Sequence, residues 1–144
     1  MHLVFVFGTL KRGFPLHNLG LEGAKYLGVC RTVEAYPVVI AGPWFAPMMF
    51  DLRRSGVRVE GELYAVDDQQ LARLDDLESV GTPGNFRRQL EVEMSSPRRV
   101  THAFAFMKDP RLAVPIHSDF LSAYHDRRFI PPWKRSESVS TARR

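Results

Sequence analysis

Residues 2–13 read HLVFVFGTLKRG, a short apolar run that ends at a glycine turn. A run of Val and Phe of this length is typical of a buried strand. Gly8 has no side chain, so a ligand can approach the backbone closely there. The successive N–H groups of Phe7, Gly8, Thr9 and Leu10 would suit a carboxylate or an oxyanion. A plain turn at the end of a strand would leave the same pattern, and the spacing is not that of a phosphate-binding loop.

Working outward from this stretch, the chain predicts mostly strands, with one clear helix and a weaker one near the end. Residues 48–52 and 57–66 are expected to pair as a hairpin, with one apolar and one polar face on the second strand. This order of elements predicts an α+β domain with a mixed, strongly curved, barrel-like sheet. The other expected elements are helices over 16–22, 68–78 and 118–127, and strands over 24–33, 36–40, 86–94 and 100–107.

Glu78 ends the clear helix, which begins after a capping Asp67. Leu74 lies one turn before Glu78, so the carboxylate can sit beside the core rather than in open water. Such a place raises the pKa of a carboxyl group, which suits proton transfer near neutral pH. A solvated glutamate at a helix end is the alternative. Of Asp75 and Asp76, one is expected to face solvent and the other to bond locally within the helix.

Length and charge describe a single globular domain over 1–133, followed by a basic tail over 134–144 that is expected to be disordered. The formal net charge is +4, and much of the excess lies in that tail. The remaining arginines form scattered doublets rather than a stripe interleaved with aromatic residues. Nucleic acid is therefore not an expected partner.

Several other chemistries lack their residue patterns. Cys30 is the only cysteine, which excludes an internal disulfide and a CxxC metal site. The five histidines show no zinc-binding spacing, and no GxSxG elbow occurs, so we expect no metal. No apolar run approaches the roughly 18 residues of a membrane span, and the apolar start is too short for a signal peptide. The sequence thus predicts a cytoplasmic protein without a membrane segment.

The order of four motifs resembles the gamma-glutamylcyclotransferase family (AIG2-like), most closely its gamma-glutamylamine cyclotransferase branch. Each motif alone is weak, but the ordered set is specific and covers about residues 3 to 107. The motifs are FGTLKRG at 7–13, YP at 36–37, VEGELY at 59–64 and LDDLE at 74–78.

The resemblance implies helices flanking the barrel, a cavity at the Gly8 loop, and a small-molecule gamma-glutamyl substrate. The substrate's own α-amine would attack its gamma-carbonyl and release 5-oxoproline and a free amine. Glu78 falls on the family's catalytic glutamate, and Phe7 to Leu10 fall on its substrate-binding stretch. No cofactor is implied, because the ring closure is intramolecular.

The sequence departs from the family pattern at two aromatic positions. Phe7 stands where the family has a tyrosine, and Phe86 replaces a tyrosine that is often followed by x-Arg, here Arg88. Both changes remove a hydroxyl group, which bears on substrate preference more than on activity. A non-catalytic member of the fold, binding a small acidic metabolite or a partner protein, is the alternative function. Oligomeric state is not predicted.

Overall fold

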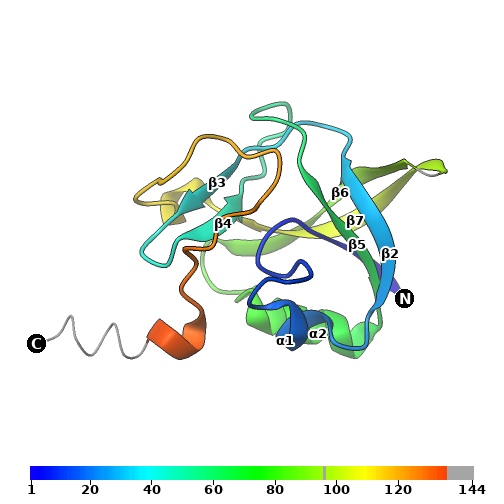
Figure 1. The fold of residues 1–144 in the computed structure, drawn as a ribbon, viewed down its shortest axis with the longest axis horizontal. Helices are drawn as coiled ribbons and strands as arrows, with labels where there is room; N and C mark the ends of the chain where they lie inside the picture. The colour runs from blue at the N-terminus through cyan, green and yellow to red at the C-terminus, as the bar shows by residue number, and fades with distance from the viewer. Residues whose placement is uncertain (96, 136–144) are drawn as a thin grey trace, which may run out of the picture.

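A closed five-stranded barrel forms the centre of the protein, seen here in a computed structural model that describes residues 1–95 and 97–135 (Figure 1). Only β1 and β7 pair in parallel, with Val4 opposite Phe104, and the other neighbours are antiparallel. The expected α+β fold with a mixed, barrel-like sheet is therefore confirmed. Around the barrel the strands are β1 (His2–Val6), β5 (Glu60–Val66), β2 (Lys25–Thr32), β6 (Asn85–Ser95) and β7 (Arg98–Lys108).

The expected hairpin between residues 48–52 and 57–66 is wrong. Instead, β3 (Val38–Ala41) pairs with β4 (Ala46–Met49) as a separate two-stranded sheet, while β5 pairs with β1 and β2. A tight turn joins β3 to β4, with Gly42 at φ 80° and Phe45 at φ 54°. Glycine adopts positive φ without strain, so Gly42 permits this turn.

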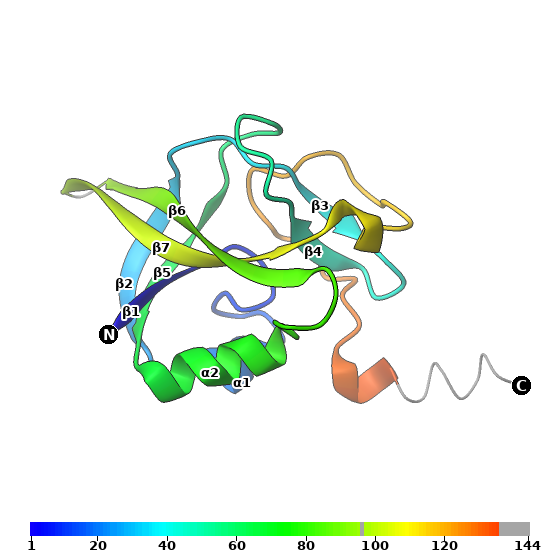
Figure 2. The same ribbon diagram turned by 180° about the vertical axis from the view of Figure 1, so that it is seen from behind.

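Two helices pack against one outer face of the barrel (Figure 2). They are α1 (His17–Leu21) and α2 (Asp68–Leu77). The expected cap is confirmed: the Asp67 carboxylate accepts from the backbone N–H of Gln70, whose side chain in turn accepts from the N–H of Asp67. Leu74 of α2 is fully buried against the barrel, which brings the end of the helix to the edge of the core.

Successive side chains of β1 point to opposite sides of the strand and belong to two separate parts of the core. Phe5 lies inside the barrel, whereas Val4 and Val6 face the helices. The expected polar face of β5 is partly wrong, because Tyr64 is buried on the side that the helices cover. Helix packing over an outer barrel face explains the difference, since that face is then no longer in water.

The terminal helix expected over 118–127 does not form. Residues 117–130 instead run as an extended segment, here called the strap, which passes over β3 and β4 (Figure 1). Its backbone N–H groups bond across the chain, from His117 to Ile40, from Leu121 to Val38 and from Ile130 to Trp44. Tertiary partners thus replace the i−4 carbonyls that a helix would have used.

The described chain continues two residues beyond the boundary that the sequence suggested at 133. Lys134 and Arg135 lie in a helical turn that starts at Pro132. The rest of the expected tail, residues 136–144, lies outside the described residues.

Candidate active site

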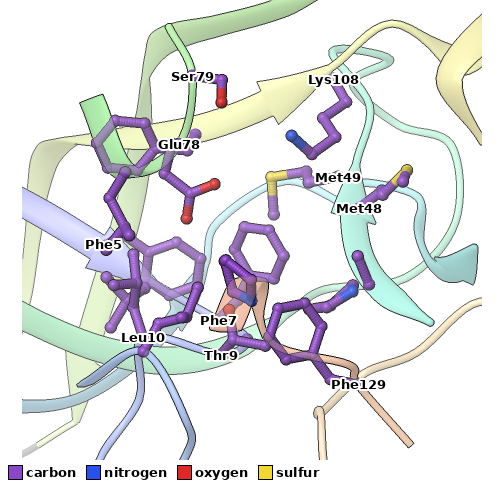
Figure 3. A pocket seen from close by; sticks show the side chains of 18 of the residues that line it. Phe5, Phe7, Thr9, Leu10, Met48, Met49, Glu78, Ser79, Lys108 and Phe129 are labelled. Atoms are coloured by element: carbon purple, nitrogen blue, oxygen red, sulfur yellow. The ribbon is translucent and has the colours of Figure 1, made fainter. Parts of the chain in front are cut away.

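A cavity of about 140 Å³ opens where β1 ends, between α2, β4, β7 and the residues that follow the strap (Figure 3). Its walls come from segments that are far apart in the sequence. All five residues that the sequence singled out line it: Phe7, Gly8, Thr9, Leu10 and Glu78. Like small-molecule sites, the cavity is lined mainly by apolar residues with a few polar groups among them.

Glu78 is the residue at which α2 ends. Its backbone N–H still bonds to the carbonyl of Leu74, at 2.9 Å, and Ser79 then turns the chain away at φ 58°. Figure 3 shows the Glu78 carboxylate pointing into the cavity. Within residues 1–95 and 97–135 this carboxylate has no hydrogen bond or ion pair closer than 4 Å. Burial raises the pKa of Glu78, and the charge of Lys108 opposes that rise.

Lys108 brings a positive charge to the same cavity from the end of β7 (Figure 3). Its ammonium donates a hydrogen bond to the side-chain oxygen of Asn85. Burial lowers the pKa of Lys108, while Glu78 raises it and Arg135 lowers it further. The sequence did not single out Lys108, because a lysine after an alternating strand is usually a solvated strand end.

The loop after β1 lines the cavity with three residues whose backbone N–H groups could serve as donors. Gly8, Thr9 and Leu10 are buried, and their N–H groups find no acceptor among the described residues. The loop carbonyls are used instead: Gly8 accepts from the N–H of Lys11, and Thr9 accepts from that of Leu16, both at 3.0 Å. Buried N–H groups are seldom left unpaired, so these three are available to a bound anion.

Contacts on the outer side of the loop hold it in this shape. The Glu62 carboxylate accepts from the backbone N–H of Arg12 and from the Tyr64 hydroxyl, both at 3.0 Å. The Lys11 ammonium donates to the carbonyl of Tyr124 in the strap, at 2.8 Å. Gly8 itself packs closely on β4, where a Cβ would lie 2.5 Å from the Pro47 ring. These contacts hold in place the part of the cavity wall that Gly8, Thr9 and Leu10 form.

Residues near the end of the described chain complete the cavity. Phe129, Pro132 and Arg135 line it. The Nε of Arg135 donates to the carbonyl of Ile130 at 2.8 Å, and the guanidinium lies 5.1 Å from the Trp44 ring and 5.4 Å from the Phe129 ring. Sequence reasoning placed Arg135 in the tail, since a polar stretch without apolar periodicity carries no sign of tertiary contact.

The two aspartates before Glu78 have different surroundings. Asp76 is exposed, as expected for one of them. Asp75 forms a two-pronged ion pair with Arg87 of β6, at 2.7 and 2.9 Å, rather than a local bond within the helix. Such paired bonds have defined geometry, so this contact ties the end of α2 to the barrel next to Glu78.

Other residue types contribute little at this site. Within the part of the chain that the structure describes, no group of three or more His, Cys, Asp or Glu has metal-binding geometry. Cys30 is buried in the barrel, and burial raises the pKa of its thiol to about 12, so it stays an unreactive core residue at neutral pH. Among the described residues, no helix is both long and apolar enough to cross a membrane.

The sequence and the fold are similar to those of known proteins. Residues 4–124 match the family model described as gamma-glutamyl cyclotransferase, AIG2-like, and the chain belongs to this family. It is similar to the human gamma-glutamylaminecyclotransferase, at 51% identity over 55% of this chain and 54% of that protein, so this match spans about half the relative's length. The bovine gamma-glutamylaminecyclotransferase is 36% identical over 89% of this chain and 81% of its own.

A solved relative supports the same assignment. A crystal structure of an AIG2-like protein from mouse superimposes with a TM-score of 0.72 at 34% identity. The superposition covers 88% of this chain and 97% of the mouse chain. The barrel and its helices are therefore those of the family.

Proposed function

We propose that this protein is a gamma-glutamylamine cyclotransferase, which converts a gamma-glutamyl amine into 5-oxoproline and a free amine. The observation that carries the proposal is one cavity that holds an unpaired carboxylate, Glu78, together with the free N–H groups of Gly8, Thr9 and Leu10. The names of the human and bovine relatives support the same reaction.

In the proposed reaction, one carbon–nitrogen bond forms as another breaks. The substrate's α-amine attacks its own gamma-carbonyl carbon, closing a five-membered ring, and the bond from that carbon to the amine nitrogen breaks. An ammonium group is not a nucleophile, so Glu78 first removes a proton from it. Ring closure releases a second proton from the same nitrogen, and both protons pass by way of the carboxyl group to the departing nitrogen, so that the amine leaves in its ammonium form. No water is consumed, which distinguishes the reaction from hydrolysis to glutamate.

The loop contributes binding and orientation. Its three N–H groups would hold the substrate's α-carboxylate or the oxyanion that develops on the gamma-carbonyl. Because the reaction is intramolecular, holding the glutamyl chain in a folded shape supplies much of the rate. The surrounding apolar wall, which includes Phe5 and Phe106, limits the entry of water.

Phe7 contributes a ring but no hydroxyl. It is buried in the barrel core, with its ring centroid 6.2 Å from that of Phe5. Any hydrogen bond that a tyrosine would make from this position is absent. We therefore expect the backbone donors and Glu78 to carry the reaction.

Release of 5-oxoproline from a panel of gamma-glutamyl amines tests the proposal directly. The matched controls are the α-glutamyl isomers, in which ring closure onto the gamma-carboxyl group would not release the amine, and N-acetylated substrates, in which the α-amine is blocked. We expect 5-oxoproline only from the unblocked gamma-linked compounds. A panel that yields glutamate instead would refute the cyclotransferase in favour of a hydrolase. No product while ligands still bind would refute it and leave the non-catalytic alternative.

Replacing Gly8 with alanine should lower kcat/KM by about 10- to 100-fold, because a shift of the loop misplaces the substrate relative to Glu78. The new Cβ would lie 2.5 Å from the Pro47 Cγ atom, so the loop and its donors must shift away from β4. Steady-state kinetics on the best panel substrate give the measurement. A Pro47→Ala change removes that Cγ atom, and the double variant should recover part of the loss. Wild-type kcat/KM in Gly8→Ala would show that the close approach is not needed.

A further inference from the structure

Lys108 lines the cavity but has no part in the proposed proton transfer. Its ammonium carries three N–H donors, and one of them bonds to the side-chain oxygen of Asn85. Within residues 1–95 and 97–135 the ammonium has no second hydrogen-bond partner, and no carboxylate lies within 4 Å of it. Figure 3 shows its side chain reaching toward the space into which Glu78 points. The other two donors are therefore available to a ligand.

A series of side-chain hydrogen bonds connects Lys108 with the turn that follows Glu78. Asn85, which holds the ammonium, donates through its own side-chain nitrogen to the Thr82 hydroxyl at 2.8 Å. That hydroxyl donates in turn to the backbone carbonyl of Ser79 at 2.7 Å. Ser79 directly follows Glu78. The cation is thus tied to the residue beside the carboxylate, so the two charged groups are positioned together.

The pairing of β1 with β7 brings Lys108 beside the loop that holds the backbone donors. These strands run parallel, with Val4 opposite Phe104. Gly8 and Lys108 each lie four residues further along, and both line the cavity. Because parallel strands leave a sheet at the same edge, the loop N–H groups and the ammonium form adjoining parts of one wall. Glu78 comes from a different element, the end of α2.

A gamma-glutamyl substrate has two groups that need such donors, and they become negative at different times. Its α-carboxylate is negative throughout, and three neighbouring backbone N–H groups suit the two oxygens of a carboxylate. Its gamma-carbonyl oxygen becomes negative only while the ring closes. A single ammonium in a site that excludes water suits a charge that develops on one oxygen.

The order of charge changes favours Lys108 for the second of these groups. Glu78 is the only acidic residue among those that line the cavity. Burial raises the pKa of Glu78 and lowers that of Lys108, and the charge of each group opposes the shift of the other. When Glu78 accepts the proton of the substrate ammonium, Lys108 loses this negative neighbour. The oxyanion then forms in the same cavity and replaces the lost negative charge.

We propose that Lys108 is a second catalytic residue, which donates a hydrogen bond to the gamma-carbonyl oxygen during ring closure, and that Asn85 positions it. As the α-amine attacks the gamma-carbon, the π-electron pair of the carbonyl moves onto this oxygen. The pair returns as the bond to the departing nitrogen breaks, and Lys108 keeps its proton throughout. This inference rests on the proposed function, and it assigns the α-carboxylate to the loop at Gly8 to Leu10.

Replacing Lys108 with methionine tests this role. We expect kcat to fall by about 10²- to 10³-fold, as for the loss of one oxyanion donor. KM should change little, because the bond strengthens only in the transition state. Lys108→Arg keeps a charged donor and should recover part of kcat. Lys25→Met is the matched control, because Lys25 is an exposed strand lysine away from the cavity, and its kcat should equal that of the wild type.

The pH profile separates this role from a purely electrostatic effect on Glu78. If Lys108 only keeps Glu78 ionised, Lys108→Met moves the acid-side midpoint of kcat to higher pH, and kcat reaches the wild-type value above that midpoint. That result would overturn the inference. We expect the loss of kcat to persist on the plateau above the midpoint.

A substrate without the α-carboxylate separates oxyanion binding from carboxylate binding. The 4-aminobutyryl amides have this structure, and their ring closure releases 2-pyrrolidinone. We expect Lys108→Met to cause the same fold loss in kcat/KM with these amides as with the gamma-glutamyl amines. Calorimetric titration with 5-oxoproline should give a similar Kd for Lys108→Met and the wild type. A loss confined to the gamma-glutamyl amines, together with a weaker Kd, would place Lys108 on the α-carboxylate instead.

A double-mutant cycle tests the positioning role of Asn85. Asn85→Ala alone should lower kcat by about 10-fold with little change in KM, because the ammonium loses its acceptor. In the Lys108→Met background the same change should cost nothing further, since residues that act through one group are not additive. Equal losses in both backgrounds would show that Asn85 acts on the fold and not through Lys108.

The same measurements distinguish failure of the inference from failure of the proposed function. If the wild type releases no 5-oxoproline from any gamma-glutamyl amine, the proposed function is wrong and the inference falls with it. If the wild type turns over and folded Lys108→Met keeps the wild-type kcat, only the inference is wrong. Circular dichroism checks the fold of each variant, and Lys108→Gln takes the place of a methionine variant that does not fold.

Discussion

Replacing Glu78 by glutamine is expected to lower kcat for 5-oxoproline release by about 10²- to 10⁴-fold, the usual range for the loss of a general acid–base group. Glutamine keeps nearly the same shape but takes no proton at neutral pH, so the substrate ammonium stays unreactive. KM should change far less, because the backbone donors at Gly8 to Leu10 are intact. Steady-state and single-turnover kinetics on one panel substrate provide the measurement.

Asp76→Asn is the matched control for this variant. Asp76 lies two residues before Glu78, is exposed, and does not line the cavity. The substitution therefore removes the same formal charge from the same helix end without touching the site. Wild-type kcat is expected for Asp76→Asn. Full activity in Glu78→Gln would show that another group carries the proton, even if the protein remains a cyclotransferase.

The same glutamine variant should be more stable than the wild type at pH 7. Burial raises the pKa of Glu78 in the folded protein above its unfolded value, so the folded state holds this proton more tightly. The stability that protonated Glu78 contributes is fully present below the pKa that this group has in the unfolded chain. It is lost as pH rises through the pKa of Glu78 in the folded protein. Glutamine removes that loss, and Tm should rise by roughly 4 °C for each kcal/mol gained.

The direction of the pKa shift of Glu78 predicts how Tm and kcat/KM each change with pH. The gain in Tm for Glu78→Gln should vanish below the ordinary glutamate pKa, near 4.5, where wild-type Glu78 is protonated in both states. In the wild type, kcat/KM should fall on the acid side with a midpoint above 4.5, since only ionised Glu78 can accept the proton. A gain in Tm that is constant from pH 4 to pH 8 would contradict a buried, titrating Glu78.

Gly61→Ala should destabilise the fold by about 3 kcal/mol or more, at the upper end of overpacking effects. Gly61 lies in β5 opposite Cys30 of β2. An added Cβ would lie 2.4 Å from the carbonyl oxygen of Val6 and 2.6 Å from the Phe5 ring. The first of these atoms belongs to the backbone of β1, so the two strands must separate. Urea or thermal unfolding followed by circular dichroism measures the loss.

A second glycine distinguishes this steric effect from backbone strain. Gly13 has φ +81°, and nothing lies within 4 Å of a Cβ built there. Gly13→Ala is therefore expected to lose only about 1–2 kcal/mol, the strain of a non-glycine residue in the left-handed region. A smaller loss for Gly61→Ala than for Gly13→Ala would show that β1 and β5 can move apart easily.

Patterns that depend on neighbours in the sequence determined much of this protein. The apolar run at 2–7 specified β1, and Asp67 with Gln70 specified the start of α2, because strand burial and helix capping are decided within a few residues. The ordered motifs also identified the five residues that meet in the cavity. They could do this only through the family resemblance, because the local patterns showed no more than that Glu78 ends a helix and Gly8 ends a strand.

Only the tertiary structure decided the partners of those elements. The turn at 53–56 suggested a hairpin, yet β5 pairs with β1 and β2, since closing the barrel satisfies both of its edges. Residues 118–127 had enough apolar residues for a helix, but no helix forms there and the N–H of Leu121 bonds to Val38 of β3. Lys108, at the end of β7, and Arg135, near the end of the described residues, both line the cavity. In the sequence, both positions look exposed to solvent. Contacts between distant segments, which no local pattern records, set the charges around Glu78.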